Sequence, residues 1–132
     1  MKHPRLAVFE TTLKRLFDSV NDHLEAKYGD RFVLHPARPP HGQTANRSHD
    51  GLFNIGASFT AGYGSRLGRG YVVQVDMVTL DRVPKEMRET IEQEAVDLVK
   101  QKLPYYFPHR HLTVERDRHV FKIRGDLRLG EV

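Results

Sequence analysis

The segment that decides the fold is residues 52–80, which read LFNIGASFTAGYGSRLGRGYVVQVDMVTL. On both sides of the Gly- and Arg-rich stretch 62–70, apolar residues alternate with polar or small ones, and this period of two is typical of β-strands. We therefore predict a long β-hairpin with residues 62–70 as the loop at its tip. The register that makes one face continuously apolar, as packing against helices requires, pairs Phe53 with Met77, Ile55 with Val75, Ala57 with Val73 and Phe59 with Tyr71.

Two amphipathic helices are predicted, one before the hairpin and one after it. Residues 5–28 and 84–103 both carry apolar side chains at three- and four-residue spacing, which places them on one helical face. Pro84 suits the first turn of the second helix, and Pro104 is expected to end it. The two apolar stripes comprise Phe9, Leu13, Leu16, Phe17, Val20 and Leu24 in the first helix, and Met87, Ile91, Ala95, Leu98, Val99 and Leu103 in the second.

Three further short strands complete the predicted sheet. Residues 31–35 form a strand candidate, and residues 111–115 and 119–124 form a second hairpin with Val114 opposite Phe121. The element order is then α-β-β-β-α-β-β. This order predicts an α+β fold, a two-layer sandwich in which two amphipathic helices lie on one face of a mostly antiparallel sheet.

The composition indicates one domain with its own core. The chain has 132 residues, of which 39% are hydrophobic and 29% charged, and we expect residues 1–132 to form a single domain with residues 125–132 as a tail. The absence of cysteine excludes disulfides, thiolate metal sites and a cysteine nucleophile. Because neither a signal peptide nor an apolar run of membrane-spanning length is evident, we predict a cytoplasmic protein without a membrane partner.

Positive charge gathers in the middle of the chain. Lys and Arg number 21 against 17 Asp and Glu, and residues 37–70 hold four arginines, two histidines and a single acid, Asp50. Part of this region, residues 36–51, contains three prolines and two glycines, which exclude a helix or a central strand. A loop of this length is usually either functional or disordered, and its composition does not decide between the two.

The loops at 36–51 and 62–70 together predict an anion-binding surface. Glycine allows successive backbone N–H groups to point at an anion, and arginine supplies forked donors that suit phosphate or carboxylate. The alternative is a solvated hairpin tip whose glycines serve only the turn. The residues predicted to bind the anion are Arg38, Arg47, Gly64, Ser65, Arg66 and Arg69.

The second face of the predicted hairpin is polar. The register places Asn54 opposite Asp76 and Gly56 opposite Gln74, and Ser58 lies on the same face. One interpretation is a face that simply contacts water. The other is the floor of a ligand site formed by Asn54, Ser58, Gln74 and Asp76, where Gly56 lets a ligand approach the backbone closely.

No motif points to a particular enzyme. The sequence lacks the phosphate-loop and dinucleotide-binding patterns, and its eight histidines do not have the spacing of zinc ligands. We therefore predict no metal, no cofactor and no catalytic residue. Asp50 and Asp76 are the carboxylates nearest to the predicted sites, and an acid–base enzyme would have to use them.

Three hypotheses for function follow. The first is a binding module for nucleic acid or another phosphate-bearing polyanion, with bases stacked on Tyr63 or Tyr71. The second is a small-ligand protein or enzyme that acts on a phosphorylated or carboxylated substrate at the polar sheet face. The third is a homodimer or larger assembly, formed through the aromatic residues 105–107 or through an unpaired sheet edge.

Overall fold

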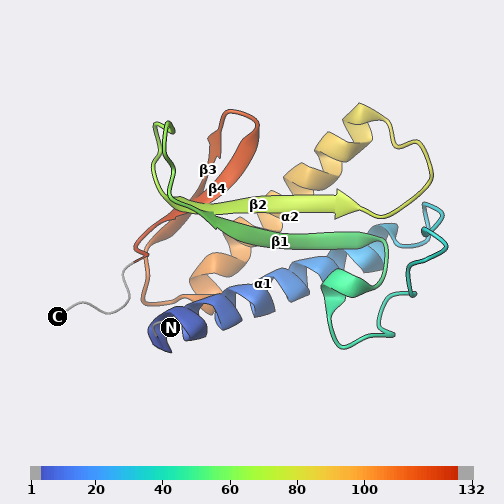
Figure 1. Cartoon of the computed structure of the whole chain (residues 1–132), viewed down its shortest axis with the longest axis horizontal. Coiled ribbons are helices and arrows are strands. Elements are labelled where there is room, and N and C mark those ends of the chain that lie inside the picture. The colour runs from blue at the N-terminus through green and yellow to red at the C-terminus, as the bar shows by residue number, and fades with distance from the viewer. Residues whose placement is uncertain (1–3, 128–132) are drawn as a thin grey trace.

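The computed structural model describes residues 4–127, apart from the side chain of Ser48, and has the predicted α+β architecture (Figure 1). Its sheet has four strands in the order β1-β2-β4-β3, and each neighbouring pair is antiparallel. The elements are helix α1 (Pro4–Tyr28), the 3-10 turn η1 (Arg47–His49), strands β1 (Phe53–Thr60) and β2 (Gly70–Met77), helix α2 (Lys85–Tyr106), and strands β3 (Leu112–Asp117) and β4 (Val120–Gly125).

The first hairpin has the predicted register along its whole length. Phe53 pairs with Met77 and Phe59 pairs with Tyr71, and the pairs between them follow in step. The inner face of this hairpin packs against the apolar stripes of both helices, which form a single core with it. Phe59, near the end of the edge strand β1, is the exception and remains 55% exposed.

The prediction of a strand at residues 31–35 was wrong. Leu34 makes only an isolated bridge with Thr79, so the element order has one strand fewer. Side chains replace the missing ladder: Asp81 accepts a hydrogen bond from the Val33 N–H, and the Thr79 hydroxyl donates to the Val33 carbonyl. Pro36 follows directly and has no N–H group to extend a strand.

Helix α2 continues through Pro104, which was expected to end it. Proline has no N–H group, so it lacks the bond to the carbonyl four residues earlier, but at this position the loss falls in the last turn. The turn still closes, because the Phe107 N–H donates to the Leu103 carbonyl at 2.8 Å.

Among the described residues, no helix is long and apolar enough to cross a membrane.

The second hairpin is shifted by two residues from its predicted register. Val114 pairs with Ile123, not with Phe121. The cause is a turn of only two residues, Arg118 and His119, in which Arg118 has a positive φ of 61°. A shift of two keeps every side chain on its face, so Val114 and Ile123 still reach the core. Of the predicted tail, residues 128–132 lie outside the described part of the chain.

Candidate anion-binding site at the hairpin tips

Lys122 joins the tips of the two hairpins. It lies on β4, on the sheet face away from the helices, yet it is only 2% exposed because loop 62–70 covers it. Its ammonium group donates to Asp117 Oδ2 at 2.7 Å, to the Gly68 carbonyl at 2.8 Å and to Ser65 Oγ at 3.1 Å. The loop of the first hairpin is therefore attached to the end of the second, and Figure 1 shows both tips extending from the same end of the sheet.

Lys122, Asp117 and Ser65 form what we call the anchor, and further hydrogen bonds within it fix the loop. The Ser65 hydroxyl donates to Asp117 and accepts from the Leu67 N–H at 3.2 Å. Chiefly the hydrogen bond from Lys122, and then that from Ser65, holds the pKa of Asp117 below its usual value. Asp117 is therefore ionised at neutral pH and balances the buried ammonium group. Ser65, one of the predicted anion ligands, has a structural role in this arrangement.

Glycines make the loop conformation possible. Gly62 and Gly64 have φ values of +79° and +77°, which ordinary residues rarely adopt. At Gly62 there is also no room for a side chain, because a Cβ atom would lie 2.1 Å from the Gly68 carbonyl group. Gly64 is open, with no atom within 4 Å of a Cβ position. These glycines thus allow the turn, and the open space at Gly64 leaves the loop tip accessible.

Arginines from both hairpins surround a hollow of about 510 Å³ at the tips. Arg66 enters it from the first hairpin, and Arg116 and Arg118 from the second. Arg116 is held in place, since its guanidinium lies 5.6 Å from the Phe121 ring centre and its Nε donates to the Arg118 carbonyl. Arg69, at the other side of the loop, is exposed as well. Residues 62–70 and 115–124 hold six basic and two acidic side chains, and their net charge equals the +4 of the whole chain.

An exposed aromatic ring shares a hollow with one of these arginines, Arg118. Tyr63 is 97% exposed and lines a second hollow, of about 320 Å³, together with Arg118 and His119. Tyr71, the other predicted stacking residue, is buried, and its hydroxyl bonds to Glu10 at 3.3 Å. Burial, with the Glu10 charge second, raises the pKa of Tyr71 to about 12. Tyr71 therefore belongs to the core, and of the two predicted stacking residues Tyr63 is the one whose ring is exposed.

Arg38 and Arg47 do not join this site. They lie in loop 36–51, which packs near the start of β1, at the opposite end of that strand from the tips. Arg38 donates to the carbonyls of Gly51, Asp50 and Phe53 at 3.0–3.1 Å. Arg47 donates to both carboxylate oxygens of Asp22 on α1 at 3.2 and 3.3 Å. Both arginines thus hold an ordered loop against the rest of the fold.

Loop 36–51 also brings carboxylates and a histidine together, which the sequence did not reveal. His41 lies between Asp22, at 3.3 Å, and the fully buried Asp50, at 3.6 Å. Burial works against the charge of Asp50, but two hydrogen bonds from Thr44, the charge of His41 and the Gly42 N–H together lower the pKa of this carboxyl. Glu25 lines an adjacent hollow of about 400 Å³, and burial raises its pKa. Among residues 4–127, no three such side chains are placed to hold a metal ion.

The predicted ligand face of the first hairpin is open to water. Asn54, Ser58, Gln74 and Asp76 are all exposed on the side of the sheet away from the helices. They pair as expected, Asn54 with Asp76, and the Ser58 hydroxyl donates to Gln74 Oε1 at 3.4 Å. The structure brings these four residues together but does not enclose them.

Only some of the residues that form the surface at the hairpin tips could be predicted from the sequence. Arg66, Arg69 and Tyr63 stood out in a Gly-rich loop, but Arg116 and Arg118 belong to a strand and turn with an ordinary mixture of charges. Their contribution depends on the anchor between Ser65 and Lys122, which are 57 positions apart. A lysine at an outward-facing strand position gives no sign that a distant loop will bury it.

Comparison with known proteins finds similarity along almost the entire chain. A protein-family model described as "Uncharacterised protein" matches residues 4–125. A protein of Borreliella burgdorferi strain B31, named "Uncharacterized protein", is 37% identical over 117 residues, which are 89% of this chain and 91% of that protein. No solved structure matches the chain. The family match includes both hairpins and loop 36–51.

Proposed function

The chain belongs to this family of uncharacterised proteins, and we propose that it is a small binding module for nucleic acid or another phosphate-rich polyanion. The observation that supports this most strongly is the buried Lys122–Asp117–Ser65 anchor. Because it fixes the two tips to each other, arginines from different parts of the chain form one surface before any ligand arrives. A preformed surface avoids the entropic cost of ordering a loop on binding.

The chemistry of the tips favours a single strand over a duplex. Arg66 and Arg118 offer forked donors that match phosphate oxygens, at a spacing set by the hollow between them. Tyr63 offers an exposed ring beside Arg118. An unpaired base can stack on such a ring, an interaction that contributes about 1–3 kcal/mol, whereas a base within a duplex is already stacked.

A small phosphorylated or carboxylated ligand is the second candidate for this surface. A mononucleotide would place its phosphate among the arginines and its base on Tyr63, using the same groups as one unit of a longer strand. The two candidates differ in how affinity depends on length. Polyanion binding strengthens as more phosphates are neutralised and falls steeply with salt, because each neutralised phosphate releases counterions.

Fluorescence anisotropy tests the proposal with short labelled single- and double-stranded DNA and RNA and with a labelled mononucleotide, at low and near-physiological salt. We expect the single strands to bind most tightly. An Arg66→Ala, Arg118→Ala variant should bind them at least about tenfold more weakly, given that hydrogen bonds to charged groups contribute about 1.5–3 kcal/mol each. The slope of the logarithm of its binding constant against the logarithm of salt concentration should be smaller in magnitude by about 0.7 for each phosphate that the variant no longer neutralises.

The matched control is an Arg82→Ala, Arg88→Ala variant, which removes the same charge from two exposed positions, one in the connection after β2 and one on α2. It should bind nearly as well as the natural sequence. An equal reduction of affinity in both variants would show that binding reflects only net charge. Absence of binding to every probe at near-physiological salt would overturn the proposal.

A further inference from the structure

Strand β1 is an unprotected sheet edge. It is the first strand in the order β1-β2-β4-β3, so one side of it has no neighbouring strand among the described residues. Its eight residues, FNIGASFT, include no charged side chain and no proline, and its pairing with β2 has no bulge. The opposite edge, β3, carries Glu115, Arg116 and Asp117 within six residues. Natural proteins use such charges to prevent edge pairing, and β1 lacks them.

The hydrogen-bond pattern shows which backbone groups of β1 are free. The Val78 N–H donates to the Leu52 carbonyl, and pairs in an antiparallel ladder alternate between bonded and non-bonded. Ile55, Ala57 and Phe59 therefore direct their N–H and C=O groups away from β2, toward the open edge. Phe53 does so as well, but its N–H donates to Glu25 at 2.9 Å and its carbonyl accepts from Arg38 at 3.1 Å.

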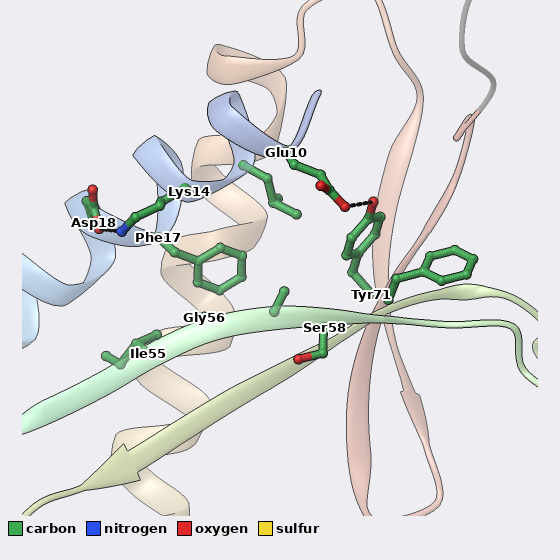
Figure 2. A pocket seen from close by; sticks show the side chains of 11 residues that line it. Glu10, Lys14, Phe17, Asp18, Ile55, Gly56, Ser58 and Tyr71 are labelled. Carbon is green, nitrogen blue, oxygen red and sulfur yellow. Dashed lines mark hydrogen bonds and ion pairs between the residues drawn. The ribbon is translucent and has the colours of Figure 1, made fainter. Parts of the chain in front are cut away.

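A groove with both polar and apolar side chains in its lining runs beside this edge. It has a volume of about 440 Å³ and lies between α1 and β1 (Figure 2). Figure 2 shows Phe17 and Ile55 on its two sides, with Glu10 and Lys14 along the α1 rim. Phe59, at the end of the groove, has half its surface exposed. The edge thus offers both unpaired backbone groups and, beside them, a recess whose apolar part is formed by Leu13, Phe17 and Ile55.

We propose that a second copy of this chain adds its β1 to this edge, antiparallel, with the two-fold axis at Ala57. Ala57 then pairs with the partner's Ala57, and Ile55 pairs with the partner's Phe59 in both directions. Each of the three edge-directed residues exchanges two backbone bonds with the other copy. The two sheets become one, and each Phe59 ring moves beside the groove of the other copy.

Self-pairing is favoured because the free groups are symmetric about Ala57, so the strand is complementary to itself. The side chains agree with this register, since a large apolar residue faces a large one, Ala57 faces its own copy, and Gly56 faces the partner's Ser58 on the other side of the sheet. Centring the axis on Gly56 would place the partner's Phe59 opposite Phe53. The backbone of Phe53 is already bonded, so that register has fewer groups available.

Sedimentation analysis of the full chain tests the assembly. The natural sequence should sediment at twice 15.3 kDa. Ala57→Pro should yield a monomer that is still folded by circular dichroism, because the N–H group that it removes points away from β2. Phe59→Lys should also yield a monomer. Tyr105→Lys, which changes an 81% exposed aromatic residue elsewhere, should leave the dimer intact. A natural sequence that stays monomeric at the highest concentration reached, or a dimer that persists in both edge variants, would overturn the proposal.

Single cysteines test the register, since the chain has none of its own. Under mild oxidation, Ala57→Cys should form a disulfide-linked dimer, because directly paired Cα atoms lie about 5.5 Å apart, within disulfide range. Asn54→Cys should not, because its Cα lies about 20 Å from the partner's equivalent atom in this register. Equal cross-linking of both variants, or of neither, would contradict the two-fold axis at Ala57. Neither experiment depends on the proposed binding at the hairpin tips.

Discussion

Single residues in this protein depart from the usual behaviour of their type. Lys122 is the clearest case, because a lysine on the outer face of a sheet is normally hydrated, whereas this one is buried under a loop. Three acceptors replace its water, and one of them, Asp117, carries the opposite charge. Removing the ammonium group of Lys122 leaves the Asp117 carboxylate without its counter-ion. The loss of this ion pair therefore destabilises the fold more than the intact pair stabilises it.

Replacing Lys122 with methionine tests the anchor. Lys122→Met keeps roughly the length of the side chain but removes its three hydrogen bonds. We expect the free energy of unfolding to fall by at least about 1.5–3 kcal/mol, the range for a single bond to a charged group. Arg124→Met is the control on the same strand and face, where a half-exposed pair with Glu115 contributes about 1 kcal/mol or less. Urea denaturation measures both. Equal destabilisation would argue against a special role for Lys122.

Glu25 should make stability depend on pH. Burial raises its pKa above 4.5, although the N–H groups of Phe53 and Leu52 oppose the shift. Between pH 4.5 and the raised value, the folded state holds this proton more tightly than the unfolded state, so this contribution to stability falls as pH rises. Glu25→Gln cannot ionise and keeps an acceptor for Phe53. Its stability relative to the natural protein should therefore increase from pH 4 to pH 7, and a constant difference in urea denaturation would contradict this.

At the scale of elements, local chemistry explains both what the sequence predicts and what it does not. The first hairpin was predictable pair by pair, because every second residue from Phe53 to Phe59 is apolar or small and only one register matches its partners. The second hairpin offers fewer apolar residues, and its two-residue turn uses Arg118 at positive φ, where glycine or asparagine would have signalled the turn. The helix end past Pro104 depends on position within the last turn, which composition does not show.

Loop 62–70 allows strain to be separated from crowding. Gly62 and Gly64 have nearly the same positive φ, but only at Gly62 would a Cβ atom strike the backbone of Gly68. Gly64→Ala should cost about 1–2 kcal/mol, the strain of a left-handed conformation. Gly62→Ala should cost more, because the loop must also open. Thermal denaturation compares the two, and similar destabilisation would show that the loop does not close on Lys122 as described.

At the scale of the whole molecule, folding sorts the charges into separate regions. The hairpin tips hold a charge equal to the net charge of the chain, while the acidic residues Asp22, Glu25 and Asp50 gather near loop 36–51. The sequence predicted arginines from both loops at one site. It could not show that β1 separates those loops, or that Arg38 and Arg47 are used by backbone carbonyls and by Asp22. Placement of this kind depends on interactions between residues far apart in the chain.

The most direct test of the proposed function is an amide chemical-shift map of the nitrogen-15-labelled protein, titrated with a short single-stranded oligonucleotide at near-physiological salt. It reports where the ligand lies as well as whether it binds. We predict that the largest shifts fall in residues 62–70 and 116–122, with little change in residues 82–88. Shifts centred on loop 36–51, shifts spread evenly over the basic surface, or no shifts at all would contradict binding at the joined hairpin tips.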